Sequence, residues 1–123
     1  MAQGILVIAE QRDGQIRRVT QEVLSEASRV AARLGCDVTA LVVGERIAEG
    51  ALSLSHYGAK TVYVADDARL AGYAVEAYCN VAKKVCDEVC PAVVMLGATA
   101  VGKDLAPRLA ARLGAGLATD IIG

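Results

Sequence analysis

Apolar residues along the chain form short continuous runs that alternate with longer segments of helical spacing. Residues 5–9 are all apolar, and runs of similar length recur at 38–43, 61–65 and 92–96. Runs of this length that are rich in β-branched side chains are typical of strands covered on both faces. The segment 117–122 near the end of the chain is a candidate fifth strand.

Between these runs the apolar positions recur every three to four residues, which predicts helices. We expect a last helix that begins at Asp104 as its N-cap and ends at Gly114, so that Pro107 falls within the first turn. The other expected helices cover 20–34 with Gly35 after it, 47–57 closed by Gly58, and 72–89.

Strands that alternate with helices favour the α/β class. We expect a doubly wound, mainly parallel sheet flanked by helices on both faces, with the first strand near the middle. The polar segment 10–18, with Asp13-Gly14 as its turn signal, predicts a surface loop or a small hairpin. The length of 123 residues predicts a single domain over 1–123, and the apolar ending at 121–123 indicates an interrupted larger protein.

The charge balance argues against binding of nucleic acid. Lys and Arg number 13 and Asp and Glu 14, which gives a net charge of −1. The chain has four Tyr, no Phe and no Trp, so few rings are present on which bases could stack. Its apolar runs are far shorter than the ~20 residues of a membrane helix, and no secretory signal is visible at the start. We therefore expect a soluble protein of a reducing compartment that is not a membrane protein.

Three of the four cysteines, Cys79, Cys86 and Cys90, lie at spacings that place them along one side of the long helix. Neighbours on one straight helix rarely meet disulfide geometry. A zinc site is disfavoured because His56 is the only histidine. We expect these thiols to be reduced and buried.

The sharpest local pattern is Gly97-Ala-Thr-Ala-Val-Gly-Lys-Asp104, which follows a predicted strand and matches a phosphate-binding loop until its last position. A working loop of that kind needs Ser or Thr at that position to hold magnesium. Three interpretations stay open at this point. The segment is a phosphate loop, a glycine turn whose Asp104 caps a helix, or a turn that faces a nucleotide or flavin beyond the carboxyl ends of the strands.

Other candidate residues are isolated. Glu10 ends the first strand and is a site candidate by position, Asp66 and Asp67 are expected in a solvated loop or a helix cap, and His56 is expected to be structural or exposed. No Gly-x-Gly-x-x-Gly follows the first strand, and the ATP signature of universal stress proteins would need glycine at Ala100. We predict no catalytic residue and no metal site.

Three segments closely resemble the N-terminal domain of electron transfer flavoprotein alpha subunits. They are Ile-Leu-Val-Ile-Ala-Glu over 5–10 with Gly14, Tyr-Gly-Ala-Lys-Thr-Val-Tyr-Val-Ala-Asp-Asp over 57–67, and Gly-Ala-Thr-Ala-Val-Gly-Lys-Asp-Leu-Ala-Pro-Arg over 97–108 with the alanine-rich helix that follows. The match continues through Gly-Leu-Ala-Thr-Asp at 116–120 and covers essentially the whole chain. In this comparison Asp104 is a normal family residue.

The resemblance implies an electron carrier, not an enzyme. In the family a heterodimer of alpha and beta subunits takes electrons from acyl-CoA or other dehydrogenases onto FAD and passes them to a quinone reductase or another acceptor. The main FAD site lies in a C-terminal domain that this chain lacks, and AMP or a second FAD belongs to the beta subunit, so we expect no tightly bound cofactor here. The implied fold is similar to the adenine nucleotide alpha hydrolase-like fold, and the implied location is the cytoplasm or the mitochondrial matrix.

The family motif supports Gly97, Thr99, Gly102, Lys103 and Asp104 as candidate cofactor-binding residues. The role that follows is a scaffold that packs against the beta subunit. A free-standing adenine-nucleotide-binding regulatory module is the alternative function. A small hydrolase is disfavoured because no nucleophile, base and oxyanion set can be assembled.

Overall fold

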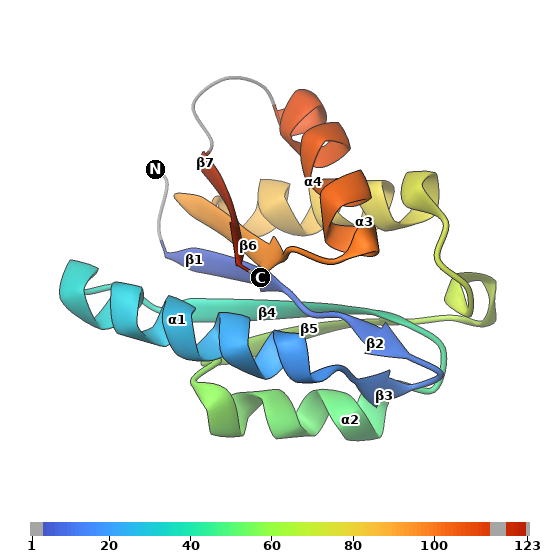
Figure 1. Ribbon diagram of the computed structural model, residues 1–123, viewed down its shortest axis with the longest axis horizontal. Helices are drawn as coiled ribbons and strands as arrows, with labels where there is room; N and C mark the ends of the chain where they lie inside the picture. The colour runs from blue at the N-terminus through green and yellow to red at the C-terminus, as the bar shows by residue number, and fades with distance from the viewer. Residues whose placement is uncertain (1–3, 114–117, 123) are drawn as a thin grey trace.

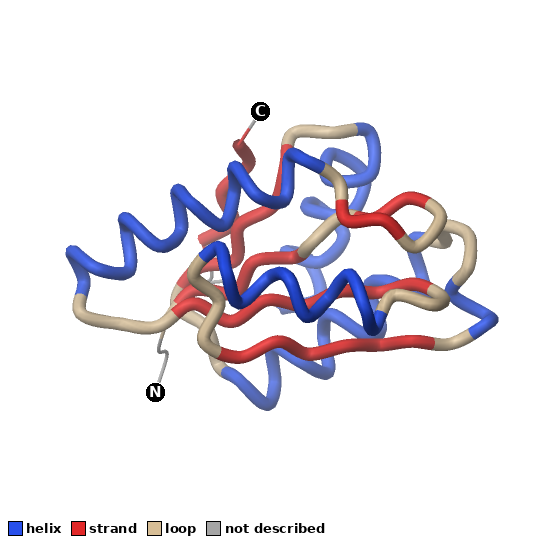
Figure 2. The backbone as a smooth tube through the Cα atoms, turned by 90° about the horizontal axis from the view of Figure 1, so that it is seen from below, coloured by secondary structure: helices blue, strands red, loops and turns tan. Residues whose placement is uncertain are grey.

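The computed structural model describes residues 4–113 and 118–122. Its main sheet has five parallel strands in the order β5-β4-β1-β6-β7, which confirms the α/β class and places the first strand in the middle. The strands run side by side with helices on either side of them (Figures 1 and 2). The elements in chain order are β1 Ile5–Ile8, β2 Gln11–Arg12, β3 Gln15–Ile16, α1 Arg18–Leu34, β4 Val38–Gly44, α2 Ala48–Leu52, the 3₁₀ helix η1 Ser53–Tyr57, β5 Thr61–Asp66, the 3₁₀ helix η2 Ala68–Leu70, α3 Val75–Val89, β6 Val93–Gly97, α4 Ala100–Leu113 and β7 Ala118–Ile122.

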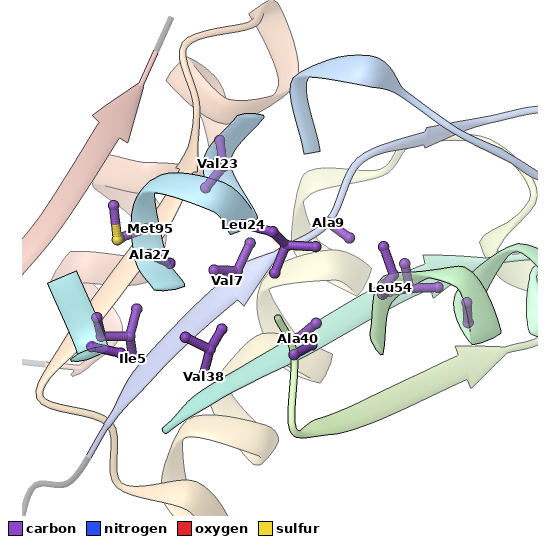
Figure 3. Close-up of a cluster of buried hydrophobic side chains, with 14 of the residues drawn as sticks. Ile5, Val7, Ala9, Val23, Leu24, Ala27, Val38, Ala40, Leu54 and Met95 are labelled. Carbon is purple, nitrogen blue, oxygen red and sulfur yellow. The ribbon is translucent and has the colours of Figure 1, made fainter. Parts of the chain in front are cut away.

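Two apolar cores lie on opposite faces of the sheet. Side chains at alternate positions of a strand point to opposite faces, so Val7 joins the core under α1 and α2 while Leu6 joins the core under α3 and α4. Leu24 of α1 packs beside Val7 in the first of these cores (Figure 3). Helices α1 and α2, which lie between β1 and β5 in the chain, thus cover one face of the sheet. Helices α3 and α4, which follow β5, cover the other face, as a doubly wound sheet requires.

The polar segment after β1 forms the small hairpin that the sequence predicts. Strands β2 and β3 pair antiparallel, with Gln11 opposite Ile16. Asp13 and Gly14 connect them with φ angles of 53° and 83°, and two positive φ values are what a type I′ hairpin turn needs. Aspartate followed by glycine adopts this turn at low cost, since glycine has no Cβ and aspartate tolerates the left-handed region.

Most element boundaries agree with the prediction to within a few residues, and the last helix is the main error. It begins at Ala100, not at Asp104, because the Thr99 hydroxyl accepts the backbone N–H of Gly102 at 3.1 Å and so caps the helix. Pro107 therefore lies in the helix interior, beyond the first turn where we expected it. The predicted stop at Gly114 lies outside the described residues.

Smaller differences have local causes. The segment predicted as one helix over 47–57 is divided into α2 and η1, and Gly58 ends it with a φ of 109°. Helix α3 begins at Val75, three residues later than expected. The candidate fifth strand is confirmed as β7, which pairs parallel with β6, although Leu117 lies outside the described residues.

Of the two aspartates at the end of β5, Asp67 is confirmed as the cap of η2, whereas Asp66 is the last residue of the strand and not a loop residue or a helix cap. The Asp66 carboxylate accepts the backbone N–H groups of Arg46 and Ile47 at 2.9 and 3.1 Å, just before α2. Asp67 accepts the N–H of Arg69 at 2.8 Å, and hydrogen bonds from Arg69 lower the pKa of Asp67 to about 2. These carboxylates hold the segments that precede α2 and form η2 in place.

The cysteine prediction is correct for two of the three helical thiols. Cys79 and Cys86 are buried under α3, but Cys90 is exposed, because it ends the helix in the left-handed region with a φ of 52°. All four cysteines are free. The part of the chain that the structure describes holds no cluster of His, Cys, Asp and Glu suited to a metal ion, and no helix there has the length and apolar character to cross a membrane.

Burial should make Cys86 far less reactive than Cys90. Desolvation raises the pKa of Cys86 to about 11, and only the thiolate attacks alkylating reagents. We expect iodoacetamide to modify Cys90 at pH 8 in the folded protein and Cys86 only after denaturation, as read by peptide mass spectrometry. Because the folded state holds the Cys86 proton more tightly, its contribution to stability is lost as pH rises from about 9 toward 11. Equal labelling rates would contradict this burial.

Candidate functional site

A cavity of about 290 Å³ lies beyond the carboxyl ends of β1 and β6. Strand β1 is followed by a crossover toward β4 and strand β6 by one toward β7, so the chain diverges between these two neighbours. Open α/β sheets bind ligands at such a point of divergence. Its walls come from the end of β1, the hairpin, the loop before α3, and the turn between β6 and α4.

Glu10 sits at the centre of the hydrogen bonds beside this cavity. Its carboxylate accepts from Arg17 Nη1 and from the Thr99 hydroxyl, each at 2.7 Å, and its side chain is only 12% exposed. Its backbone N–H donates to Thr20 Oγ1 at 2.7 Å, and the Thr20 hydroxyl, 2% exposed, donates to the Glu10 carbonyl at 3.1 Å. The end of β1 is thus tied to α1 and to the start of α4.

The Glu10 carboxylate lies beside the turn that nearly matches a phosphate-binding loop. The N-terminus of a helix that follows a strand favours an anion, through its free N–H groups and its dipole. Here the Glu10 carboxylate lies beside that N-terminus, because it accepts the hydroxyl of Thr99, the residue that caps α4. Thr99 uses its hydroxyl both to donate to Glu10 and to accept from Gly102, so it links the Glu10 carboxylate to the first turn of α4.

The structure separates the five candidate residues of the family motif. Gly97 and Gly102 line the cavity, and Thr99 caps the helix beside it. Lys103 is exposed and is not among the residues that line the cavity. Asp104 accepts the Tyr73 hydroxyl at 2.8 Å and lies 3.6 Å from Arg108. A cofactor contact by all five residues stays a prediction, and the geometry favours a structural role for the motif.

Two tyrosines that were not among the predicted site residues form one wall of the cavity. The rings of Tyr73 and Tyr78 meet edge to face, with centroids 4.9 Å apart. Burial and the neighbouring Asp104 carboxylate raise the pKa of Tyr73. Burial also raises the pKa of Tyr78, whose hydroxyl donates to the Val43 carbonyl at 3.3 Å. Both phenols therefore stay protonated and serve as hydrogen-bond donors, not as bases.

Arg17, Tyr73 and Tyr78 were missed because their partners are distant in sequence. Arg17 lies after the hairpin, and only the turn at Asp13-Gly14 brings it back to Glu10. A local signal was present only for the cap of α4, namely the spacing of Thr99 and Gly102. A hydroxyl three residues before a helical N–H is typical of a cap. His56 is exposed in η1, as predicted.

Removal of the Thr99 hydroxyl should loosen the start of α4. Thr99→Ala leaves the Gly102 N–H without its cap and removes one partner of Glu10, so we expect a loss of about 1–2 kcal/mol of unfolding free energy. Urea denaturation followed by circular dichroism measures this. Thr99→Ser is the matched control and should retain most of the stability, because it keeps the hydroxyl. Equal stability of the alanine variant would show that the cap contributes nothing.

Comparison with known sequences adds a family match. Residues 5–123 match the model of the electron transfer flavoprotein domain. Protein FixB of Clostridium saccharobutylicum is 44% identical over 117 residues, which are 95% of this chain and 35% of that protein. Electron transfer flavoprotein subunit alpha of Bacillus subtilis is 40% identical over 122 residues, which are 99% of this chain and 37% of that protein. The chain thus spans about a third of the length of these relatives.

Comparison with solved structures supports the fold. A universal stress protein from Archaeoglobus fulgidus superposes with a TM-score of 0.62 at 16% identity, and the whole of each chain is covered. A universal stress protein in complex with cAMP gives a TM-score of 0.55 at 18% identity, covering 100% of this chain and 98% of that one. These likenesses place the chain among α/β folds related to the adenine nucleotide alpha hydrolase-like fold.

Proposed function

Because the chain belongs to the electron transfer flavoprotein domain family, we propose that it is the N-terminal scaffold domain, over residues 1–123, of an electron transfer flavoprotein alpha subunit. The observation that carries this is the family match over residues 5–123, together with relatives at about 40% identity that are named electron transfer flavoprotein subunit alpha. In the whole protein this domain supports a carrier that moves electrons from dehydrogenases through FAD to a quinone reductase or another acceptor.

The cavity geometry supports a scaffold in preference to a nucleotide site. Glu10 and Arg17 neutralise each other, and the Glu10 carboxylate lies beside the start of α4. A phosphate placed there would meet a carboxylate at close range, which is unfavourable. We therefore expect the FAD of the full complex, and AMP or a second FAD in the beta subunit, to be held by other parts of the assembly.

The proposed partner is the beta subunit, against which this domain packs as the base for a mobile flavin-bearing domain. Names among the relatives support a role in electron transfer to or from dehydrogenases and reductases. One is the LctC subunit of a lactate dehydrogenase (NAD(+),ferredoxin) from Acetobacterium woodii, and another is an acryloyl-CoA reductase electron transfer subunit beta from Anaerotignum propionicum. We propose that the assembly is an electron carrier that works in the cytoplasm, or in the mitochondrial matrix where the source is eukaryotic.

A free-standing adenine-nucleotide regulator is not favoured. The family match and the relatives named subunit alpha point to a part of an electron carrier. Native mass spectrometry of the chain mixed with FAD, AMP or ATP separates the two functions. We expect no stoichiometric adduct, whereas a tight adduct with either adenine nucleotide would favour the regulator.

Co-purification with the beta subunit tests the scaffold directly. The tagged chain and the cognate beta subunit, produced together, should elute as one complex, and a longer alpha chain serves as the positive control. Association should survive Glu10→Gln, because that side chain lies at the internal end of β1 and not on an outer strand. Failure of this chain to bind, with normal binding of the longer chain, would overturn the proposal.

A further inference from the structure

The cavity beside Glu10 is large enough to hold a small organic molecule. It measures about 290 Å³, whereas a cavity of roughly 150 Å³ can already hold one benzene ring. Its floor is apolar and consists of Ile8, Leu96 and Leu105, which are 8%, 2% and 2% exposed. The exposed residues of its lining include Ala71 and Tyr73, so solvent reaches the cavity from that side. The space fits a ligand of one or two rings but not a dinucleotide.

The wall of two tyrosines favours an aromatic ligand. The ring of Tyr78 is held by its edge-to-face contact with Tyr73 and by the hydrogen bond to the Val43 carbonyl. Tyr73 is held in turn by its hydrogen bond to Asp104. Both rings are therefore fixed before a ligand enters, so binding costs little side-chain entropy. Fixed rings of this kind bind another ring by offset stacking or by an edge-to-face contact.

The charged groups of the cavity lining cancel one another. The acidic side chains are Glu10 and Asp13, and the basic ones are Arg12 and Arg17. Arg17 lies 2.7 Å from Glu10, so these two charges already neutralise each other. A cationic ligand would compete with Arg17 for Glu10, and an anionic ligand would meet the Glu10 carboxylate. The pairing within the chain therefore selects a ligand without a net charge.

The same ion pair offers a hydrogen-bond acceptor next to a donor. The Glu10 carboxylate accepts two hydrogen bonds, although a carboxylate can accept about four. Within the described residues, the Arg17 guanidinium uses one of its five N–H groups. We propose that the cavity binds a neutral aromatic carboxamide or lactam of one or two rings, whose N–H donates to Glu10 and whose carbonyl accepts from Arg17. Its ring lies against Tyr73 and over the apolar floor.

Benzamide and three analogues test the site by NMR titration of the ¹⁵N-labelled chain. Benzamide should shift the amide signals of Gly97 and Gly102, which line the cavity, and not those of Gly35 and Gly58, which do not. Benzoate and benzylamine keep the ring but carry a charge, and should bind at least about tenfold more weakly. Acetophenone keeps the ring and the carbonyl but has no N–H for Glu10, and should bind about fivefold more weakly.

Two substitutions separate this recognition from non-specific contact. Glu10→Gln removes the negative charge and leaves Arg17 without its anion, so the preference should invert and benzoate should bind more tightly than benzamide. Ala71→Trp should fill the open side of the cavity and abolish the shifts. Ala74→Trp is the matched control, because Ala74 is also exposed but does not line the cavity, and it should leave binding unchanged. Circular dichroism shows whether each variant is folded.

The four titrations of the parent chain decide the question if a variant does not fold. The absence of shifts with benzamide at its solubility limit, or equal affinity for benzamide and benzoate, would overturn the proposal. Retention of the benzamide preference in folded Glu10→Gln would do the same. This ligand site goes beyond the scaffold role, and co-purification with the beta subunit is a separate measurement, so the failure of one is distinguishable from the failure of the other.

Discussion

Replacement of Gly102 by alanine should be one of the most destabilising single changes in this chain. A Cβ built at Gly102 would lie 1.9 Å from the Gly97 carbonyl oxygen, and the obstacle is backbone that cannot rotate away. The start of α4 must then move off the end of β6. We expect a net loss of about 2–3 kcal/mol of unfolding free energy, even though alanine favours a helix over glycine by about 1 kcal/mol.

The same movement should break the link between Glu10 and Thr99, because Thr99 caps the helix that is displaced. Urea denaturation measures the stability, and the Gly72→Ala variant is the matched control. Gly72 has no atom within 4 Å of a built Cβ and no positive φ, so its replacement should change stability by less than about 0.5 kcal/mol. Equal stability of the two variants would contradict the close packing of Gly102 in α4 against the Gly97 carbonyl at the end of β6.

This close approach also explains why the sequence misplaced the start of α4. Thr99 and Asp104 both belong to the residue types that cap helices, so composition cannot choose between them. The choice follows from Gly102, since only glycine lets the chain turn back tightly enough for the helix to begin at Ala100. Contact between the last residue of β6 and the third residue of α4 is a property of the fold, not of the local pattern.

The strands, and the place of the first strand near the middle of the sheet, were predictable for a different reason. Each apolar run is long enough to specify a strand, and the alternation with helices leaves few ways to connect parallel strands. The expected cover on both faces is wrong for β5, which is exposed or half-buried because it lies at the edge of the sheet. Glu10 was selected for its position after β1, and the structure confirms that it lies beside the cavity. Its partners were not predictable, because Thr99 is 89 positions away in the sequence.

Helical spacing has a similar limit in α1. Leu24 and Leu34 both fit the apolar pattern of this helix, yet Leu24 is fully buried and Leu34 is 66% exposed. The difference arises because Leu34 is the last residue of the helix, beyond the strands that α1 covers. Spacing reports the direction of a side chain around the helix axis but not whether a neighbour is present at that height.

Replacement of each leucine by alanine separates these two positions. Leu24→Ala should cost about 2–5 kcal/mol, because the side chain packs with Val7 and Leu54 in a core that cannot collapse around a void (Figure 3). Leu34→Ala makes the same chemical change in the same helix and should stay within about 0.5 kcal/mol of the parent. Denaturation midpoints of the two variants, measured together, give the difference without reference to helix propensity.

The outcome bears on how α1 is fixed to the sheet. A large loss at Leu24 alone means that the helix is held by its central contacts with β1 and β4, and that its last turn is free to contact another surface. Equal losses at both positions would mean that Leu34 is covered in solution. In that case the cover must come from outside the described residues of this chain, since none of these buries Leu34.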